Sequence, residues 1–413
     1  MKAVVEPSKV FGKIKAPQSK SYAIRYIFSA ILTDIEIPNL IESSDIIDAI
    51  NAVSIFGIRR EGTRFRRPVE LSLRSDRVFV KGSATVLRML IPIVAVVGGR
   101  LHIDGDETLR RRPLKTIVKA LSSKGISFSS NSLPLIMEGK LRDNYIELDG
   151  GESSQYITGF MYAFALSGGG TIVVKPSIPS KIYIYLTAQV LKEIGIDVHV
   201  YENRVDVEVY DKPRSISVEV PGDFLLASFY VAASLITGGE IEIYGLSKLG
   251  RDPGYHPIVD VYRGMGAYSV FKDGVWIASA ARDYRGVVVD VEQDPDIAPS
   301  VAALASVVQG ETILLNVSRL RIKESDRIET ITNVLQSFGV KCWFDGSNMH
   351  IYGGTLRRSR IVCPDDHRVA MMGAAIATKV GGEIDRAECV DKSNPGFWSD
   401  LMKLNTRVSL VSL

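Results

Sequence analysis

The chain has 413 residues, of which 46% are hydrophobic and 23% are charged, and its 50 basic and 47 acidic side chains leave a net charge of +3. This length suffices for two or three domains, and the composition excludes a largely disordered or fibrous protein. The small net charge argues against a protein whose main task is to coat nucleic acid, so any functional charge must be local.

The cysteines and the apolar stretches bear on the cellular compartment. The three cysteines, Cys342, Cys363 and Cys389, form no Cys-x-x-Cys pair, which predicts reduced thiols in a cytoplasmic protein and no structural zinc cluster. Residues 1–15 lack the apolar core of a signal peptide, and the longest uncharged stretches, such as 224–239, fall short of the roughly 18 residues of a membrane-spanning helix. The sequence therefore predicts neither secretion nor membrane insertion.

Two interleaved series of glycines divide the chain into repeats. The first series ends apolar helical segments at spacings of 70, 70, 72 and 71 residues: Gly98, Gly168, Gly238, Gly310 and Gly381. The second series ends other helical segments: Gly57, Gly125, Gly195, Gly266 and Gly339. Solenoid repeats have periods of about 20 to 50 residues, so the longer period indicates repeated α/β subdomains.

Six repeats fit the chain, each with strands alternating with two helices and ending in a strand pair. One helix of each repeat is almost wholly apolar and should be buried, as in 224–236, 297–308 and 369–377. The other is amphipathic and should face solvent, as in 326–338. The pattern predicts an α/β protein of two domains, with helices packed inside and sheets outside.

Polar and cationic residues stand where several apolar helices should begin. The segment 15–25 holds Lys20, Ser21 and Arg25, and 81–88 repeats this design before a helix over 85–97. Backbone N–H groups at a helix start, with cations nearby, suit a phosphate or a carboxylate. Ordinary serine capping explains each segment about as well when it is taken alone, and the Walker loop pattern is missing.

The middle of the chain offers further groups of this kind. Ser153, Ser154 and Gln155 open the apolar helix of the third repeat and could either cap it or bind a phosphate. Arg112 ends a run of three arginines that would usually be a solvated surface. The following Pro113 could take the first position of a helix over 113–123 and hold Arg112 at its entrance.

Carboxylates accompany cations in the last third of the chain. Asp296 precedes an apolar helix and could cap it or accept a substrate proton. Lys323 and Arg327 lie four residues apart with Glu324 beside them, so in a helix they would hold an anion next to an acid or base. An exposed ion-paired surface is the alternative. The Asp366-His367-Arg368 segment matches no standard metal-site spacing, so no metal is expected.

Together, and in this order along the chain, the motifs resemble those of the 5-enolpyruvylshikimate-3-phosphate synthase family. The motifs concerned are Ser19-Lys20-Ser21 with Arg25, Arg110 to Pro113, Ser153-Ser154-Gln155, Pro295-Asp296, Lys323 to Arg327, Asp366-His367-Arg368 and Lys392. The resemblance implies an inside-out α/β barrel fold of two domains, each with three βαβαββ units. It also implies that residues 1–19 join 221–413 in one domain, that 20–220 form the other, and that the active site lies in the cleft between them.

The family reaction implied by the resemblance moves the enolpyruvyl group of phosphoenolpyruvate to the 5-hydroxyl of shikimate 3-phosphate and releases phosphate. It requires no metal or organic cofactor. The expected partners are therefore the two small-molecule substrates, and the expected enzyme is a cytoplasmic monomer.

The resemblance also assigns roles to residues. Shikimate 3-phosphate would contact Lys20, Ser21, Arg25, Ser153, Ser154, Gln155, Ser180, Asp296 and Lys323, with Tyr183 nearby. Phosphoenolpyruvate would contact Lys20, Ala84, Arg112, Gln155, Arg327, Arg368 and Lys392. Asp296 would be the base at the hydroxyl and Glu324 the acid and later base at the methylene carbon, while Lys20 and Lys392 would stabilise charge.

Two other functions remain open at this point. A sister enzyme transfers the same group to UDP-N-acetylglucosamine, but its usual loop cysteine has no counterpart around Arg110 to Pro113. A nucleic-acid-binding scaffold is suggested by the arginines around Phe65 in 59–67, since cations and an aromatic ring can follow a phosphate backbone. Steep salt-dependent binding of oligonucleotides without transferase activity would favour the scaffold.

Overall fold

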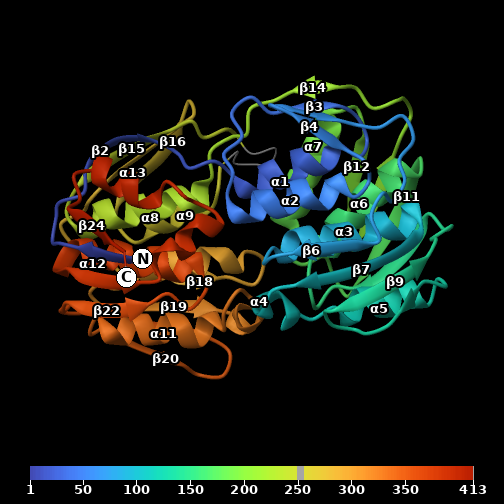
Figure 1. Cartoon of the computed structure of the whole chain (residues 1–413). Coiled ribbons are helices and arrows are strands. Elements are labelled where there is room, and N and C mark those ends of the chain that lie inside the picture. Colours follow the sequence, from blue (N-terminus) through green and yellow to red (C-terminus); the bar gives the residue numbers. More distant parts are fainter. Residues whose placement is uncertain (249–254, 413) are drawn as a thin grey trace. The chain divides into compact units, whose positions relative to one another are not determined.

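The computed structural model describes residues 1–248 and 255–412, which form two compact units (Figure 1). The terminal unit consists of Met1–Ser19 with Pro221–Leu413, and the central unit consists of Lys20–Val220. Each unit has its own hydrophobic core, and the members of each core come from that unit alone.

The described part of the central unit holds three four-stranded sheets that share one pattern. In each sheet the first two strands are parallel and the remaining neighbours are antiparallel. The strand orders are β14 (Ile216–Ser217), β3 (Ile35–Glu36), β5 (Arg64–Arg66), β4 (Arg59–Glu61); β6 (Arg77–Val80), β7 (Gly99–Gly105), β9 (Leu135–Gly139), β8 (Ser127–Phe128); and β10 (Tyr145–Asp149), β11 (Gly169–Lys175), β13 (Arg204–Glu208), β12 (Asp197–Val200).

The described part of the terminal unit repeats this pattern in three more sheets. Here too one parallel pair is followed by antiparallel neighbours. The strand orders are β2 (Gly12–Lys15), β15 (Glu240–Tyr244), β17 (Val275–Ser279), β16 (Tyr268–Lys272); β18 (Val288–Asp290), β19 (Glu311–Leu315), β21 (Met349–Tyr352), β20 (Lys341–Phe344); and β22 (Ser359–Val362), β23 (Gly382–Asp385), β1 (Lys2–Val5), β24 (Val408–Val411).

Strands from the first residues of the chain complete two sheets of the terminal unit. Strand β2 runs parallel to β15, with Ile14 opposite Ile243. Strand β1 lies between β23 and β24, with Ala3 opposite both Ile384 and Leu410. The two ends of the chain therefore lie close together in this unit (Figure 1).

Apolar helices form the interior of each unit. Helix α8 is buried along its whole length, and the Asp223 carboxylate caps it by accepting hydrogen bonds of 2.9 Å from the Leu225 and Leu226 N–H groups. In the central unit α3 packs against α6, and in the terminal unit α8, α10 and α12 pack against one another. The buried helices are α1 (Lys20–Ser29), α3 (Ala84–Val97), α6 (Gln155–Leu166), α8 (Phe224–Ile236), α10 (Ala298–Ala305) and α12 (His367–Val380).

The remaining helices bury one face and expose the other. In α5, for example, Ile117 and Leu121 are buried while neighbouring lysines face solvent. These helices are α2 (Ser44–Ser54), α4 (Glu107–Arg110), α5 (Lys115–Ser122), α7 (Lys181–Glu193), α9 (Ile258–Gly264), α11 (Arg327–Ser337) and α13 (Phe397–Lys403). The 3₁₀ helices of the described residues are η1 (Pro295–Ile297), which leads into α10, η2 (Val317–Ile322) and η3 (Ala387–Lys392).

The prediction of an α/β chain with buried apolar helices is confirmed. Helix α8 has the predicted bounds, and α3 begins one residue earlier than predicted. The predicted helix 297–308 is shorter, because its first turn is the 3₁₀ helix η1 and its last residues leave the helix after Ala305. In the described residues, no helix is long and apolar enough to cross a membrane.

The prediction of three reduced cysteines is wrong. Cys363 and Cys389 form a disulfide with a Cα–Cα distance of 6.7 Å, while Cys342 is a buried free thiol. The two bonded residues follow β22 and β23, and the carboxyl ends of these adjacent parallel strands lie at the same edge of one sheet. The sequence spacing alone gave no sign of this proximity.

Candidate functional site

The first predicted motif lies at the start of helix α1 in the central unit. Lys20 is the first residue of this helix, and its Nζ lies 2.7 Å from Oδ2 of Asp45 on α2. Only 15% of the Lys20 side chain and 4% of the Asp45 side chain are exposed. The sequence analysis missed Asp45, which balances the charge of Lys20 in this structure.

Arg25 is buried one turn further along α1. Its guanidinium donates to the Thr187 hydroxyl at 2.8 Å, to the Ser21 carbonyl at 2.9 Å and to the Tyr183 carbonyl at 3.3 Å. Burial lowers the pKa of Arg25, since the charged form loses its hydration. Arg25 thus joins the start of α1 to helix α7.

Ser180 lies at the start of helix α7, close to the carbonyl that Arg25 contacts. It is the N-cap residue of α7 and has a left-handed backbone, with φ of 49°. Because Arg25 reaches the carbonyl of Tyr183 in the first turn of α7, the structure brings Ser21, Arg25 and the Ser180 turn together.

The Ser153-Ser154-Gln155 motif opens helix α6 as predicted. Ser154 is the N-cap residue and Gln155 is the first residue of the helix. The Gln155 side chain donates to the Thr85 hydroxyl at 2.7 Å and accepts from Arg88 Nη1 at 3.1 Å. The motif is therefore tied to the start of α3, where Ala84 is the first helical residue.

The loop before α3 is held by an aspartate that the sequence analysis did not identify. Asp48 on α2 is buried, and its carboxylate accepts hydrogen bonds from the backbone N–H groups of Lys81 at 2.9 Å and of Gly82 and Ser83 at 3.0 Å each. Burial raises the pKa of Asp48, although these three N–H groups favour its charged form. This carboxylate fixes the path of the chain into Ala84.

The prediction that Pro113 begins a helix and holds Arg112 at its entrance is wrong. Helix α5 begins at Lys115, after the N-cap residue Leu114. The Pro113 carbonyl instead accepts a 3.1 Å hydrogen bond from Arg88. Arg112 therefore lies in the turn between α4 and α5, close in the chain to a carbonyl that Arg88 holds.

In the terminal unit, Arg327 organises the acidic residues. Its side chain is fully buried and donates to Asp296 at 2.7 Å, to Glu324 at 2.7 Å and to both oxygens of Asp366 at 2.7 and 3.2 Å. Burial opposes the charged guanidinium, but the three carboxylates outweigh this effect and hold the pKa of Arg327 well above its usual value. The two predicted acid–base residues are thus joined by one cation.

Lys323 also contacts this cluster, but its backbone is extended and not helical as predicted. It ends η2 with an extended backbone, and helix α11 begins only at Arg327, so the two residues are not one helical turn apart. The Lys323 Nζ nevertheless lies 3.1 Å from Asp296 Oδ1. Burial lowers the pKa of Lys323, while Asp296 acts in the opposite direction.

Arg368 and Lys392 each follow one of the two disulfide-bonded cysteines in the chain, Cys363 and Cys389. Asp366 caps α12 and accepts a 3.1 Å hydrogen bond from the Arg368 backbone N–H, so Asp366 links the start of this helix to Arg327. Lys392 is the last residue of η3. In the terminal unit, Asp296, Lys323, Glu324, Arg327 and Arg368 thus lie at or just before helix starts, while Lys392 lies at the end of η3.

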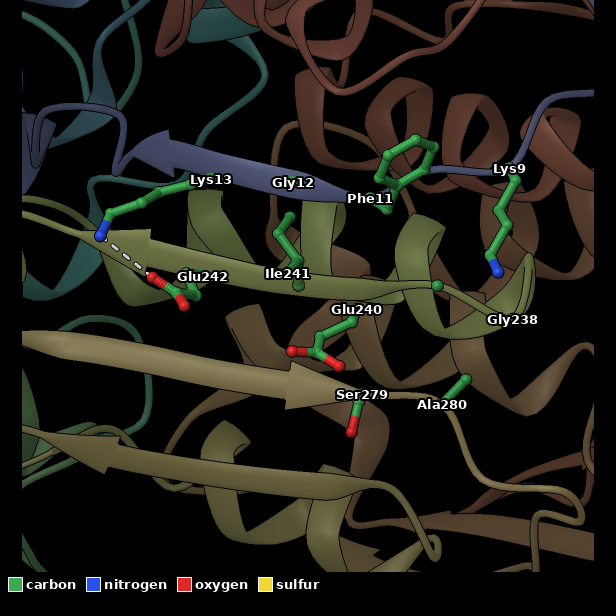
Figure 2. Close-up of a pocket in the computed structure, with 11 residues that line it drawn as sticks. Lys9, Phe11, Gly12, Lys13, Gly238, Glu240, Ile241, Glu242, Ser279 and Ala280 are labelled. Carbon is green, nitrogen blue, oxygen red and sulfur yellow. Dashed lines mark ion pairs between the residues drawn. The ribbon is translucent and has the colours of Figure 1, made fainter.

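A surface depression lies elsewhere in the terminal unit. It measures about 990 Å³ and extends over β2, β15 and β17, where an ion pair of 3.0 Å joins Lys13 to Glu242 (Figure 2). Its lining comes from these strands and the adjoining turns, away from the helix starts that carry the predicted residues. In residues 1–248 and 255–412, no group of three or more His, Cys, Asp or Glu side chains is placed to hold a metal ion.

The arginine-rich segment forms the hairpin of β4 and β5. Phe65 is 1% exposed, so its ring cannot stack on a base. The surrounding arginines pair with acidic side chains, namely Arg60 with Glu42, Arg64 with Glu36, and Arg66 with Asp34 and Glu61. This surface is therefore an ion-paired face of the sheet.

Comparisons with known proteins agree along the whole chain. The family model described as EPSP synthase (3-phosphoshikimate 1-carboxyvinyltransferase) matches residues 4–401. A protein of Sulfurisphaera tokodaii named 3-phosphoshikimate 1-carboxyvinyltransferase is 46% identical over 404 residues, which are 98% of each chain. One of the same name from Saccharolobus solfataricus is 45% identical over 98% of this chain and 99% of its own.

Solved structures show the same fold. An EPSP synthase from Acinetobacter baumannii superimposes with a TM-score of 0.77 at 20% identity, and the match covers 100% of both chains. The family model covers nearly all of this sequence, and the relatives match it from end to end. The chain therefore belongs to the EPSP synthase family.

Proposed function

We propose that the protein is a 3-phosphoshikimate 1-carboxyvinyltransferase, which transfers the enolpyruvyl group of phosphoenolpyruvate to the 5-hydroxyl of shikimate 3-phosphate and releases phosphate. Membership of the family supports this activity. The observation on this chain that most directly supports the activity is the Arg327 cluster, in which one buried cation holds Asp296 and Glu324. A reaction that moves protons at two different atoms, the hydroxyl oxygen and C3, is served by two such groups held in place.

The chemistry divides into addition and elimination. In the addition, the 5-hydroxyl loses a proton as its oxygen bonds to C2 of phosphoenolpyruvate, and C3 gains a proton to become a methyl group. In the elimination, the bond from C2 to the phosphate oxygen breaks and the methyl group loses a proton, which restores the double bond. We assign the hydroxyl proton to Asp296 and both C3 protons to Glu324, with Lys20 and Lys392 stabilising the developing charge.

The substrate contacts are proposed from the same family pattern. Shikimate 3-phosphate would be held by Lys20, Ser21, Arg25, Ser153, Ser154, Gln155, Ser180, Asp296 and Lys323, and phosphoenolpyruvate by Lys20, Ala84, Arg112, Gln155, Arg327, Arg368 and Lys392. The joining of Ser21, Arg25 and the Ser180 turn supports the first set. The bond from Gln155 to Thr85 supports a role for Gln155 next to both substrates.

The deciding experiment measures phosphate release from phosphoenolpyruvate by the purified protein, with and without shikimate 3-phosphate, in metal-free buffer. Release that requires both substrates is expected. If UDP-N-acetylglucosamine replaced shikimate 3-phosphate as acceptor, the protein would be the sister transferase. If a folded sample released no phosphate with either acceptor, the proposal would be wrong.

Two substitutions test the proton-transfer assignments. Asp296→Asn and Glu324→Gln should each lower kcat by about 10²- to 10⁴-fold, since each removes a positioned acid or base. Glu329→Gln is the matched control, because Glu329 is an exposed carboxylate in the first turn of helix α11, five residues after Glu324. An unchanged kcat in either test variant would contradict its assigned role.

We further propose that the enzyme works as a cytoplasmic monomer whose partners are these two small molecules. Both sets of assigned residues come from one chain, which supports a monomer. Sedimentation of the purified protein at the mass of one chain, 45.3 kDa, is the expected result.

A further inference from the structure

The disulfide joins two segments that each lead into an assigned cation. Cys363 follows β22 and lies three residues before Asp366, which caps the helix that carries Arg368. Cys389 lies in η3, three residues before Lys392 at the end of that 3₁₀ helix. The Cys363–Cys389 bond therefore connects the loop 363–366 to the turn 386–392.

A second contact joins the same two segments. Asp365 and Arg386 both have left-handed backbones, with φ of 61° and 55°, and their side chains form an ion pair. Both side chains are about half exposed, and exposed ion pairs contribute little to stability. The covalent bond is therefore the stronger of these two side-chain connections.

Each segment is also held to neighbouring parts of the terminal unit, and at the start of η3 the Ala387 N–H donates to the Met1 carbonyl at 3.0 Å. The Cys363 N–H donates to the Asp385 carbonyl at 3.0 Å, which fixes the start of the loop to the end of β23. On the other side, Trp398 donates to the Ala387 carbonyl at 2.9 Å at the beginning of η3. Helix α12 also packs against η3, and the disulfide adds a covalent constraint on the distance from the start of α12 to the end of η3, where Arg368 and Lys392 lie.

We propose that the Cys363–Cys389 disulfide is a positioning link that sets the spacing of Arg368 and Lys392, so that reducing it weakens the binding of phosphoenolpyruvate. This inference rests on the proposed function, which assigns both cations to that substrate. A carboxylate and a phosphate on one small molecule require cations at a defined separation, so a small movement of η3 weakens both contacts together.

The chemical change is a two-electron reduction. A dithiol reductant such as dithiothreitol attacks the disulfide and the S–S bond breaks. Cys363 and Cys389 take up two electrons and two protons from the reductant and become thiols, while the reductant closes to its own cyclic disulfide. Cys363 is fully buried but Cys389 is partly exposed, so its sulfur is the accessible side of the bond.

The first measurement counts thiols in the unfolded, unreduced protein. One thiol, from Cys342, is expected, and three after reduction. Three thiols without reduction would overturn the proposal, since no link would exist.

The second measurement separates positioning from general stability. Steady-state kinetics are compared for the oxidised protein, the reduced protein and the Cys363→Ser/Cys389→Ser variant, well below the unfolding temperature of the reduced form. We expect KM for phosphoenolpyruvate to rise at least about threefold while KM for shikimate 3-phosphate stays within about twofold. The Cys342→Ala variant, also in the terminal unit, should respond to reductant as the unaltered protein does.

Several outcomes would overturn the link. An unchanged KM for phosphoenolpyruvate after reduction would do so, and so would an equal rise of both KM values, since that would indicate general loosening. If neither redox form released phosphate, the proposed function would fail instead. Hydrogen exchange needs no activity and would then decide the link: faster exchange confined to 363–370 and 386–394 supports it, and no change in these segments rejects it.

Discussion

At the scale of single residues, the terminal unit depends on one buried charge. Arg327 is 0% exposed and makes four hydrogen bonds to three carboxylates that come from η1, the turn before α11 and the start of α12. Burial of such a group is tolerated only when each partner is present, since removing one partner leaves an uncompensated charge. The arginine that we assign to substrate binding is therefore also a structural residue.

Replacing Arg327 with glutamine should destabilise the protein by about 3–5 kcal/mol, because Asp296, Glu324 and Asp366 would lose their shared cation. Denaturant unfolding of the variant and the unaltered protein measures this difference. The matched control is Arg360→Gln, which removes an arginine that is 63% exposed and pairs with Asp385 at 2.6 Å. The control should cost only about 0–1 kcal/mol, and equal costs for the two variants would refute the argument.

At the scale of elements, helix α2 contacts the starts of two helices that carry assigned residues in the central unit. Two of its buried residues, one turn apart, face these two starts: Asp45 reaches Lys20, and Asp48 holds the loop before α3. The helix thus couples the start of α1 to the start of α3 without supplying an assigned contact of its own. Removing either carboxylate should act on substrate binding through the residue it holds.

Asp48→Ala should remove the buried acceptor of three backbone N–H groups and cost about 1–3 kcal/mol of stability. It should also raise KM for phosphoenolpyruvate, because Ala84 follows the released loop. Asn51→Ala on the exposed face of the same helix should leave both quantities unchanged. If Asp48→Ala lost stability but kept its KM, the loop would not depend on Asp48 for its path.

The hairpin of β20 and β21 carries a pH-dependent contact. The His350 ring stacks on Trp343 and lies 2.9 Å from Asp345 and 2.8 Å from Glu311. Its hydrogen bonds to Asp345 and Glu311 raise the pKa of His350. The folded protein therefore binds this proton more tightly than the unfolded chain does.

This raised pKa predicts the sign of a stability change. The contribution of His350 is fully present below the unfolded pKa of about 6.5 and is lost as the pH rises through the higher folded pKa. The difference in unfolding free energy between the unaltered protein and His350→Gln should therefore shrink as the pH rises from about 6.5 through the folded pKa of His350. Urea unfolding across the range measures it, and a difference that grew with pH would have the wrong sign. His199→Gln on strand β12, with about half of its side chain exposed, is the control.

The sequence predicted periodic features well and contacts between distant segments poorly. The apolar helices and their start residues follow from hydrophobic periodicity and glycine spacing, which are local properties of the chain. Asp45 and Asp48 were missed because they lie on α2, far in sequence from the loops they hold. The disulfide was missed for the same reason, since its 26-residue separation is closed only by the pairing of β22 with β23.

At the scale of the whole molecule, the chain holds two separate hydrophobic cores. The core of the central unit is drawn from residues 22–220, an unbroken stretch of sequence. The core of the terminal unit needs residues from both ends of the chain, from Ala3 to Ala16 and from Phe224 to Leu404. The two units should therefore differ in whether they can fold alone.

A fragment of residues 20–220 should fold by itself with a single cooperative unfolding transition, measured by circular dichroism in denaturant. A fragment of residues 221–413 should not, because strand β1 lies between β23 and β24 and its loss separates them. Adding a peptide of residues 1–19 should restore folding of that fragment. If the 221–413 fragment unfolded cooperatively by itself and the peptide did not change this transition, the prediction would be wrong.

The position of β1 has a consequence for the protein as it leaves the ribosome. The strand is made long before its partners β23 (Gly382–Asp385) and β24 (Val408–Val411). The central unit lies between them in the sequence and can fold while synthesis continues, but the apolar residues of β1 must wait unpaired until β23 and β24 are made. During that time β1 is exposed to aggregation and to binding by a chaperone.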